Sequence, residues 1–195
     1  MVRHVCPWWG GYFIDNRVRR WLHDPARILG PYVRPGMRVL DFGCGMGCFS
    51  IPMADMVGPD GLVIAADLQP RMLRAVRKRA DRAGIGGRIR THECGRDTVG
   101  LAEPVDFALA FWSAHEVPDV RRLLKEIEAL LVVGGALLVA EPRVHVSRGK
   151  FRQMMDAARE IGLLPDEPRC RIRWSWSAAL VKDGPGRGEE PRSSM

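Results

Sequence analysis

The sequence predicts an α/β fold in which helices cover both faces of a mostly parallel sheet. From residue 37 onward, short apolar runs alternate with longer runs whose apolar residues recur at helical spacing, and Gly- and Pro-rich turns separate them. Strands that alternate with helices pair in parallel, because each helix returns the chain to the starting edge of the sheet. The 195 residues, 46% of them hydrophobic, suffice for one domain with a full core.

Each element has its own signal. Prolines are tolerated in the first turn of a helix, so Pro70 and Pro118 are expected to begin helices, and Gly84 and Gly134 to end them. The expected helices are 48–57, 70–83, 118–131 and 147–161. The expected strands are 37–42, 62–66, 88–93, 105–111, 136–140, 169–173 and 176–181.

The two ends of the chain differ from this core. Residues 1–36 hold a dense set of aromatic side chains and a helical run, which we interpret as a cap folded over the sheet; a helix packed on the sheet edge is the alternative. The core domain is expected at 37–182. Residues 183–195 are almost all Gly, Pro, Arg, Glu and Ser, so we expect a disordered tail.

Composition narrows the class of protein. The net charge of +7 raises the chance of an acidic partner, but the basic residues are spread over helix faces, so we expect no nucleic-acid partner. No apolar run is long enough to span a membrane, and the first residues lack the features of a signal peptide, so we expect a cytoplasmic location. Five cysteines without a C-x-x-C spacing favour unpaired thiols and no metal site.

A glycine run stands where a ligand is expected. In sheets of this kind, ligands bind beyond the carboxyl ends of the strands, which here are followed by 43–47, Asp67, 93–96, 111–116 and Glu141. Gly43, Gly45 and Gly47 would let a ligand approach the backbone closely. Cys48 occupies the position of the third glycine in the dinucleotide fingerprint, so a pyrophosphate ligand and an oxidoreductase are disfavoured.

Residues 39–47 read Val-Leu-Asp-Phe-Gly-Cys-Gly-Met-Gly. This run resembles the first motif of class I S-adenosylmethionine-dependent methyltransferases, in particular small stand-alone members of the ubiquinone/menaquinone-biosynthesis type. The resemblance continues through 66–72, 106–115 and 131–139 and covers roughly residues 35–182. It implies a Rossmann-like sheet of seven strands, with an antiparallel last strand inserted between the fifth and sixth, and S-adenosylmethionine as the cofactor.

The resemblance also implies roles for individual residues. The three glycines would line the methionine part of the cofactor, Asp41 would orient its amino group, Asp67 would bind the ribose hydroxyls and Leu68 would pack on the adenine. The loop 93–97 lacks the Gly-Asp-Ala pattern of many relatives. The full expected cofactor-binding set is Asp41, Gly43, Cys44, Gly45, Gly47, Asp67, Leu68, Cys94, Gly95 and Phe111.

His115 and Glu116 are the candidate catalytic residues. A histidine near the carboxyl ends of the strands could act as a general base or hold the acceptor. The alternative is that His115 caps the helix expected to begin at Pro118. Methyl transfer needs a base only when the acceptor must lose a proton, because the sulfonium is already activated.

The expected activity is methyl transfer to a small-molecule acceptor, with a homodimer left open. Methylation of RNA or protein is an alternative motivated by the charge, and a cofactor-binding partner subunit without activity is another. Cys44, Cys48 and Cys94 also raise arsenite methylation as an option, although the favoured interpretation is that they are small buried residues that fill space.

Overall fold

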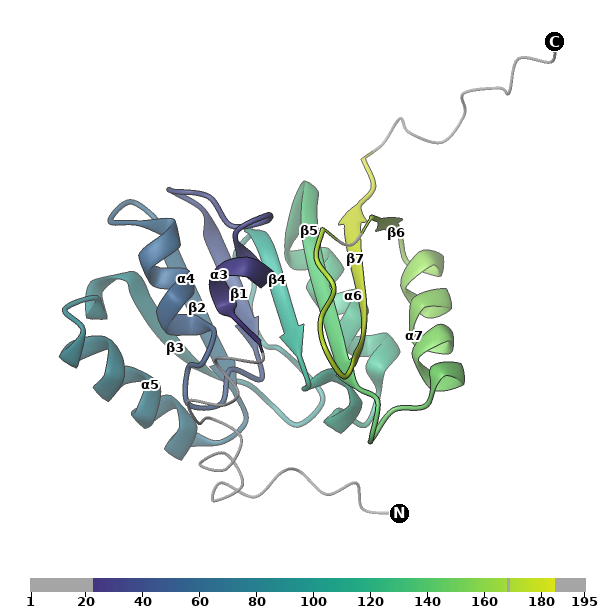
Figure 1. Cartoon of the computed structure of the whole chain (residues 1–195), viewed down its shortest axis with the longest axis horizontal. Coiled ribbons are helices and arrows are strands. Elements are labelled where there is room, and N and C mark those ends of the chain that lie inside the picture. Colours follow the sequence, from purple (N-terminus) through teal and green to yellow (C-terminus); the bar gives the residue numbers. More distant parts are fainter. Residues whose placement is uncertain (1–22, 168, 185–195) are drawn as a thin grey trace, which may run out of the picture.

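A seven-stranded sheet forms the centre of the molecule (Figure 1). The computed structural model describes residues 23–167 and 169–184. The strands lie in the order β3-β2-β1-β4-β5-β7-β6. Their bounds are β1 Arg38–Phe42, β2 Leu62–Asp67, β3 Ile89–Glu93, β4 Val105–Phe111, β5 Leu131–Pro142, β6 Leu163–Asp166 and β7 Ser175–Lys182.

The sheet confirms the predicted topology. The pairs β1–β2, β1–β4, β2–β3 and β4–β5 are all parallel, whereas β7 runs antiparallel to both β5 and β6. In Figure 1 the arrowhead of β4 therefore points to the lower edge and that of β7 to the upper edge. The last strand is inserted between the fifth and the sixth, which is the Rossmann-like arrangement that the sequence predicts.

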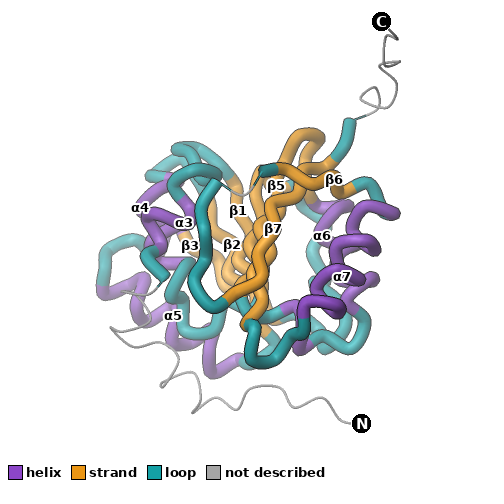
Figure 2. Tube along the Cα trace, turned by 45° about the vertical axis from the view of Figure 1, so that its right-hand side comes forward, coloured by secondary structure: helices purple, strands orange, loops and turns teal. Residues whose placement is uncertain are grey.

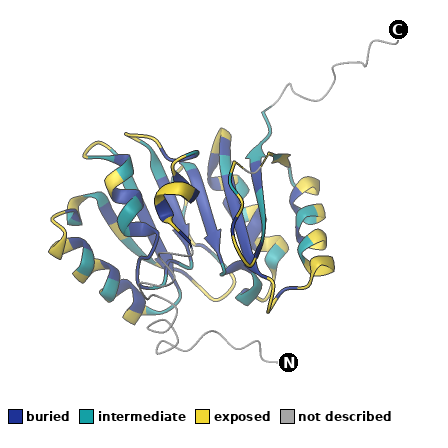
Figure 3. Cartoon of the chain, in the orientation of Figure 1, coloured by how far each residue is buried: buried dark blue, intermediate teal, exposed yellow. Residues whose placement is uncertain are grey.

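Helices cover both faces of the sheet (Figure 2). The helices α3 (Pro25–Leu29), α4 (Ser50–Val57) and α5 (Pro70–Arg82) contribute to one apolar core, and α6 (Val120–Leu130) and α7 (Arg148–Glu160) to the other. Two single-turn helices, η1 (Gly86–Arg88) and η2 (Ala114–Glu116), lie in loops. The central strands are buried along their length and the outer helix faces are exposed (Figure 3), as expected for a sheet covered on both sides.

The sixth strand lies earlier than predicted. It is Leu163–Asp166, and the expected strand at 169–173 is wrong. Leu163 is fully buried and pairs with Lys182 of β7, whereas residues 169–173 form a connection whose Ile172 packs on the other core. Pro165 is tolerated because β6 is an edge strand.

The fifth strand begins five residues earlier than predicted. Leu131 already pairs with Val105, and the register then shifts so that Phe107 faces Ala136. Gly134, at φ +77°, lies in this bulge, and a side chain at Gly135 would meet the carbonyl oxygen of Val132 at 2.8 Å. The two glycines therefore shape an irregular strand and do not end the preceding helix, which stops at Leu130.

The start of α6 was predicted two residues too early. Asp119 is the N-cap, and its carboxylate accepts the N–H of Arg122 at 2.9 Å, so the helix begins at Val120 and not at Pro118. Ser147 caps α7 in the same way through Lys150.

The chain ends are only partly described. Within the predicted cap, α3 buries Ile28 and Leu29 in the same core as α4, while residues 1–22 lie outside the described part. The predicted tail at 183–195 lies outside it from residue 185 onward. Both assignments stay predictions. Within the described residues, no helix combines the length and the apolar character that a membrane crossing requires.

Candidate active site

A cavity of about 550 Å³ lies beyond the carboxyl ends of β1, β2 and β4. Every segment that follows a parallel strand contributes to its wall, as the strand-end rule predicts. All the residues of the expected cofactor-binding set except Gly47 line it, and so do His115 and Glu116. The further lining residues are Phe42, Met46, Cys48, Phe49, Gln69, Met72, Arg96, Trp112, Ser113, Val117, Pro142, Val144 and His145.

The glycine loop, residues 43–47 after β1, is fixed by backbone hydrogen bonds to β2. The N–H groups of Gly43 and Cys44 both donate to the carbonyl oxygen of Ala66, at 2.8 and 3.0 Å. Gly43, Gly45 and Gly47 have φ values of +69°, +53° and +85°, which other residues rarely adopt. A side chain at Gly45 would meet no protein atom within 4 Å, so the cavity comes directly against bare backbone there.

Gly47 faces α5 and does not line the cavity. A side chain on Gly47 would point at Val76 of α5, 3.2 Å away, so this glycine permits close packing of loop and helix. Its predicted contact with the cofactor stays a prediction, and the described geometry supports a structural role instead.

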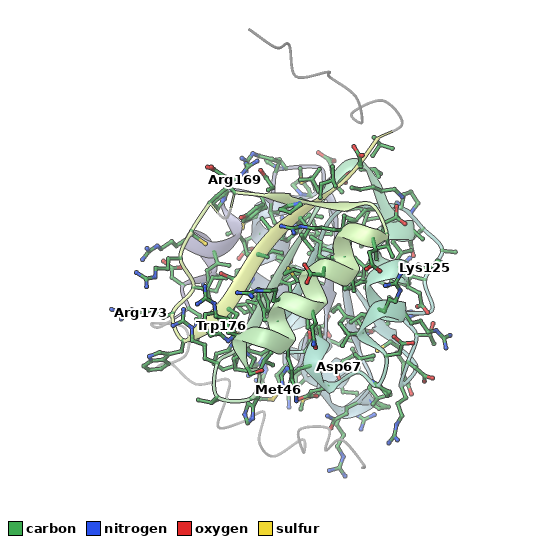
Figure 4. All side chains as sticks on the ribbon, turned by 90° about the vertical axis from the view of Figure 1, so that its right-hand side faces the viewer. Met46, Asp67, Lys125, Arg169, Arg173 and Trp176 are labelled. Atoms are coloured by element: carbon green, nitrogen blue, oxygen red, sulfur yellow. The ribbon has the colours of Figure 1, made fainter. Side chains whose placement is uncertain are left out.

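Asp67, at the end of β2, is hydrogen-bonded to the glycine loop. One carboxylate oxygen accepts the N–H of Gly45 at 2.9 Å and the other accepts the N–H of Gln69 at 2.8 Å. Burial raises the pKa of Asp67, and these two hydrogen bonds oppose the rise. Each oxygen keeps a second lone pair, so the carboxylate can still accept hydrogen bonds from a diol. Figure 4 shows Asp67 and Met46 near the same edge of the molecule.

Asp41 is a buried carboxylate near the end of β1. It is 2% exposed, and it accepts a hydrogen bond from the hydroxyl of Ser50 at 2.5 Å. Asp41 therefore ties β1 to the first turn of α4 beneath the cavity. Ser50 was not predicted, because it looks in the sequence like any polar residue at a helix start.

Aromatic rings form one wall of the cavity. Phe111, at the end of β4, packs against Phe49 with 4.5 Å between the ring centroids. Trp112 follows at φ +58°, and its indole N–H donates to the hydroxyl of Ser175 at 2.8 Å. His23, the first described residue, sets its ring edge-on to both Phe111 and Trp112. The described part of the chain thus begins next to this wall.

His115 pairs with a carboxylate that the candidate set did not include. Its Nδ1 lies 2.5 Å from Oε2 of Glu141, and its backbone N–H donates to Oε1 at 3.3 Å. The His145 ring stacks on the His115 ring, with 5.8 Å between centroids. His115 does not cap α6, because Asp119 does so. Glu141 lies near the carboxyl end of β5 as Asp67 lies at that of β2. The sequence already places Glu141 at this edge of the sheet, but it assigns no role to it.

Three cysteines line the cavity but form no ligand set. Cys44, Cys48 and Cys94 are all buried free thiols. Across residues 23–167 and 169–184, no group of three His, Cys, Asp or Glu side chains is arranged to hold a metal ion. The geometry therefore lends no support to arsenite methylation.

The thiol of Cys94 is expected to react slowly. Two causes raise the pKa of Cys94 to about 11: burial has the larger effect and the charge of Asp67 the smaller one. Only about one thiol in a thousand is therefore ionised at pH 8. Iodoacetamide should therefore label Cys94 at least about tenfold more slowly than it labels glutathione, as measured by peptide mass spectrometry. Equal labelling rates would show that the thiol is neither buried nor neutral.

Comparison with known proteins identifies the family. A model described as a methyltransferase domain matches residues 39–135, from β1 into β5. The chain belongs to the class I S-adenosylmethionine-dependent methyltransferases. The glycine loop and Asp67 fit the family's cofactor, because bare backbone and a carboxylate that can accept hydrogen bonds from a diol face one cavity.

Curated relatives share the methyltransferase domain but are longer. Demethylmenaquinone methyltransferase of Bacillus cytotoxicus is 27% identical over 139 residues, which are 71% of this chain and 57% of the relative. The ubiquinone/menaquinone biosynthesis C-methyltransferase of Pasteurella multocida is 31% identical over 110 residues, 56% of this chain and 41% of the relative. Nocamycin O-methyltransferase of Saccharothrix syringae is 33% identical over 109 residues, 56% of this chain and 39% of the relative.

Solved structures support the fold. A S-adenosylmethionine-dependent methyltransferase from Aquifex aeolicus superposes with a TM-score of 0.79 at 19% identity, over 90% of this chain and 98% of that one. A methyltransferase from Pyrococcus furiosus gives 0.65 at 15% identity, over 85% and 82%. The first of these is matched over nearly its whole length, so the two folds have almost the same extent.

Proposed function

We propose that this protein transfers a methyl group from S-adenosylmethionine to a small-molecule acceptor. One observation carries the proposal: the bare backbone at Gly45 and the carboxylate of Asp67 face a single cavity of about 550 Å³, within the range typical of small-ligand sites. The bound cofactor supplies an electrophilic methyl group on a positively charged sulfur. The chain itself must bind the cofactor and the acceptor, orient them toward each other and exclude water from the cavity.

The residues of the glycine loop would hold the methionine part of the cofactor. Asp67 would accept the ribose hydroxyls with its free lone pairs, and Leu68 would pack on the adenine. Cys94 and Gly95 would border the adenine from the end of β3, and Phe111 would line the opposite wall. These roles are those that the sequence predicts, and the shared cavity supports them.

A small acceptor is favoured over RNA or protein. The relatives named above act on quinone precursors or on nocamycin, according to their names. The cavity continues past the cofactor residues to His115, Glu116 and His145, which leaves a place for a second ligand. The homodimer and the cytoplasmic location stay predictions, as does the cap formed by residues 1–36.

Calorimetry and turnover together test the proposal. The full chain should bind S-adenosylmethionine and S-adenosylhomocysteine saturably, and it should release S-adenosylhomocysteine when a panel of quinols, phenols and other small nucleophiles is supplied. Binding without turnover on any acceptor would favour the non-catalytic partner subunit. A lack of binding would refute the proposal, and a salt-sensitive complex with RNA would favour the nucleic-acid alternative.

A further inference from the structure

His115 stands where two cavities meet. It lines the cavity of about 550 Å³ and also a second one of about 480 Å³ between η2 and α7. Glu116 and His145 are the other residues that both cavities share. An acceptor in the second cavity would therefore reach the first one past the His115 ring.

The carboxylate of Glu141 holds the His115 ring in its orientation. The carboxylate is 0% exposed and receives both the ring N–H and the backbone N–H of His115. A carboxylate is costly to bury without such donors, so this pair is held firmly. Because Nδ1 donates to Glu141, the neutral ring carries its proton there, and Nε2 is left as a proton acceptor.

The remaining edge of the ring is the one available to a ligand. The His115 side chain is 21% exposed and lines both cavities, and Nδ1 is engaged by the buried carboxylate, so Nε2 is the ring nitrogen that remains for a ligand. A histidine oriented by a buried carboxylate and facing a cavity has the arrangement of a general base.

We propose that His115 is the general base for an acceptor with a phenolic or enolic hydroxyl, and that Glu141 is its positioning residue. This inference rests on the proposed methyl transfer. The hydroxyl proton passes to Nε2 of His115, and an oxygen electron pair forms the new bond to the methyl carbon. The carbon–sulfur bond breaks with its electron pair staying on sulfur, and the imidazolium later returns its proton to water.

The charges around the second cavity suit an acceptor that becomes an anion. Arg121 and Lys150 are its cationic lining residues, and Glu116 is the one carboxylate that lines it. Arg121 also pairs with Glu160 at the protein surface. Lys150 forms no ion pair within the described residues, so its charge would attract an oxyanion formed in this cavity.

The test uses para-nitrophenol, whose absorbance distinguishes the phenol from the phenolate. With S-adenosylhomocysteine bound, the wild-type full chain should bind this probe as phenolate below the pH at which the free probe ionises. His115→Gln should lower the ionised fraction of bound probe at least about tenfold. His92→Gln is the control, because His92 lies on β3 outside both cavities and its Nε2 forms a hydrogen bond with the carbonyl oxygen of Val99.

A second measurement addresses Glu141. Histidine nitrogen NMR of the full chain should show the neutral His115 ring protonated on Nδ1. Glu141→Gln should weaken that preference and lower the ionised fraction of bound para-nitrophenol, and Glu141→Asp should restore part of both. A residue with a merely structural role would leave the probe's ionisation unchanged.

The outcomes separate this inference from the proposed function. Equal ionisation of bound probe in wild type and His115→Gln, or no saturable binding of the probe, would overturn the assignment of His115. S-adenosylhomocysteine affinity measured on the same variants should stay within about twofold of wild type, since His115 is placed at the acceptor. Failure of the wild type to bind S-adenosylhomocysteine would instead refute the proposed function.

Discussion

Gly43→Ala is expected to destabilise the fold by about 3 kcal/mol and to abolish cofactor binding. At φ +69° an alanine is strained, and its Cβ would lie 2.3 Å from Cβ of Ser113. Ser113 cannot move away easily, because its hydroxyl donates to the carbonyl oxygen of Phe42 at 2.9 Å. The glycine loop and the end of β4 would have to separate. Urea unfolding and calorimetry with S-adenosylhomocysteine measure the two effects.

Two further variants divide this loss into its parts. Gly36→Ala places alanine at φ +80° with no atom within 4 Å, so it reports backbone strain alone, about 1 to 2 kcal/mol. Ser113→Gly in the Gly43→Ala background removes the clash and should recover part of the stability. If Gly43→Ala lowers the free energy of unfolding by no more than Gly36→Ala does, the close approach of Gly43 to Ser113 is refuted.

Asp67→Ala is expected to weaken the binding of S-adenosylmethionine at least about a hundredfold. The variant removes the acceptor proposed for the ribose hydroxyls and also leaves the N–H groups of Gly45 and Gln69 without their carboxylate. Hydrogen bonds to a charged acceptor each contribute about 1.5 to 3 kcal/mol, so losing the ribose pair alone accounts for this change. Calorimetry measures the affinity, and circular dichroism checks that the variant folds.

The affinity should also depend on pH through the same carboxylate. The ribose hydroxyls favour the charged form of Asp67, whose pKa burial raises in the free protein. Affinity should therefore fall as the pH is lowered through that raised pKa, because protonation removes an acceptor. Asp67→Asn should bind weakly at every pH and lose this dependence. An unchanged pH profile in Asp67→Asn would show that another group is responsible.

The unliganded protein should show the opposite trend. A carboxyl whose folded-state pKa is raised binds protons more readily in the folded than in the unfolded state. Its contribution to the free energy of unfolding is thus favourable at low pH and is lost as the pH rises through the folded-state pKa. The difference in stability between wild type and Asp67→Asn, followed against pH without cofactor, isolates this contribution.

The cofactor half of the site could be predicted because its signals are local. Gly43, Gly45 and Asp67 each stand at the end of a strand that its own apolar run identifies, and the positive φ of the loop requires glycine. The pair of His115 and Glu141 could not be predicted in the same way. The two residues are 26 apart in the sequence, and they meet because β4 and β5 are neighbours in the sheet.

The errors in the fold have the same origin. Leu163–Asp166 contains too few residues to show a strand period, and it becomes a strand because β7 offers it an edge. The early start of β5 depends on a bulge whose extra residues look like a helix-ending turn, with Gly134 and Gly135 adjacent. In both places a partner elsewhere in the chain decides the local conformation.

The antiparallel strand β7 has a consequence for how this enzyme class can diversify. Ser175, at its start, accepts the indole N–H of Trp112, and Trp176 donates to the carbonyl of Val146, so β7 contacts the loops that follow β4 and β5. Gly45 and Asp67 belong to strands on the other side of β4. We therefore expect substitutions in the C-terminal third to change acceptor specificity more than cofactor affinity, which makes this third the natural target for directed evolution of new acceptor specificity.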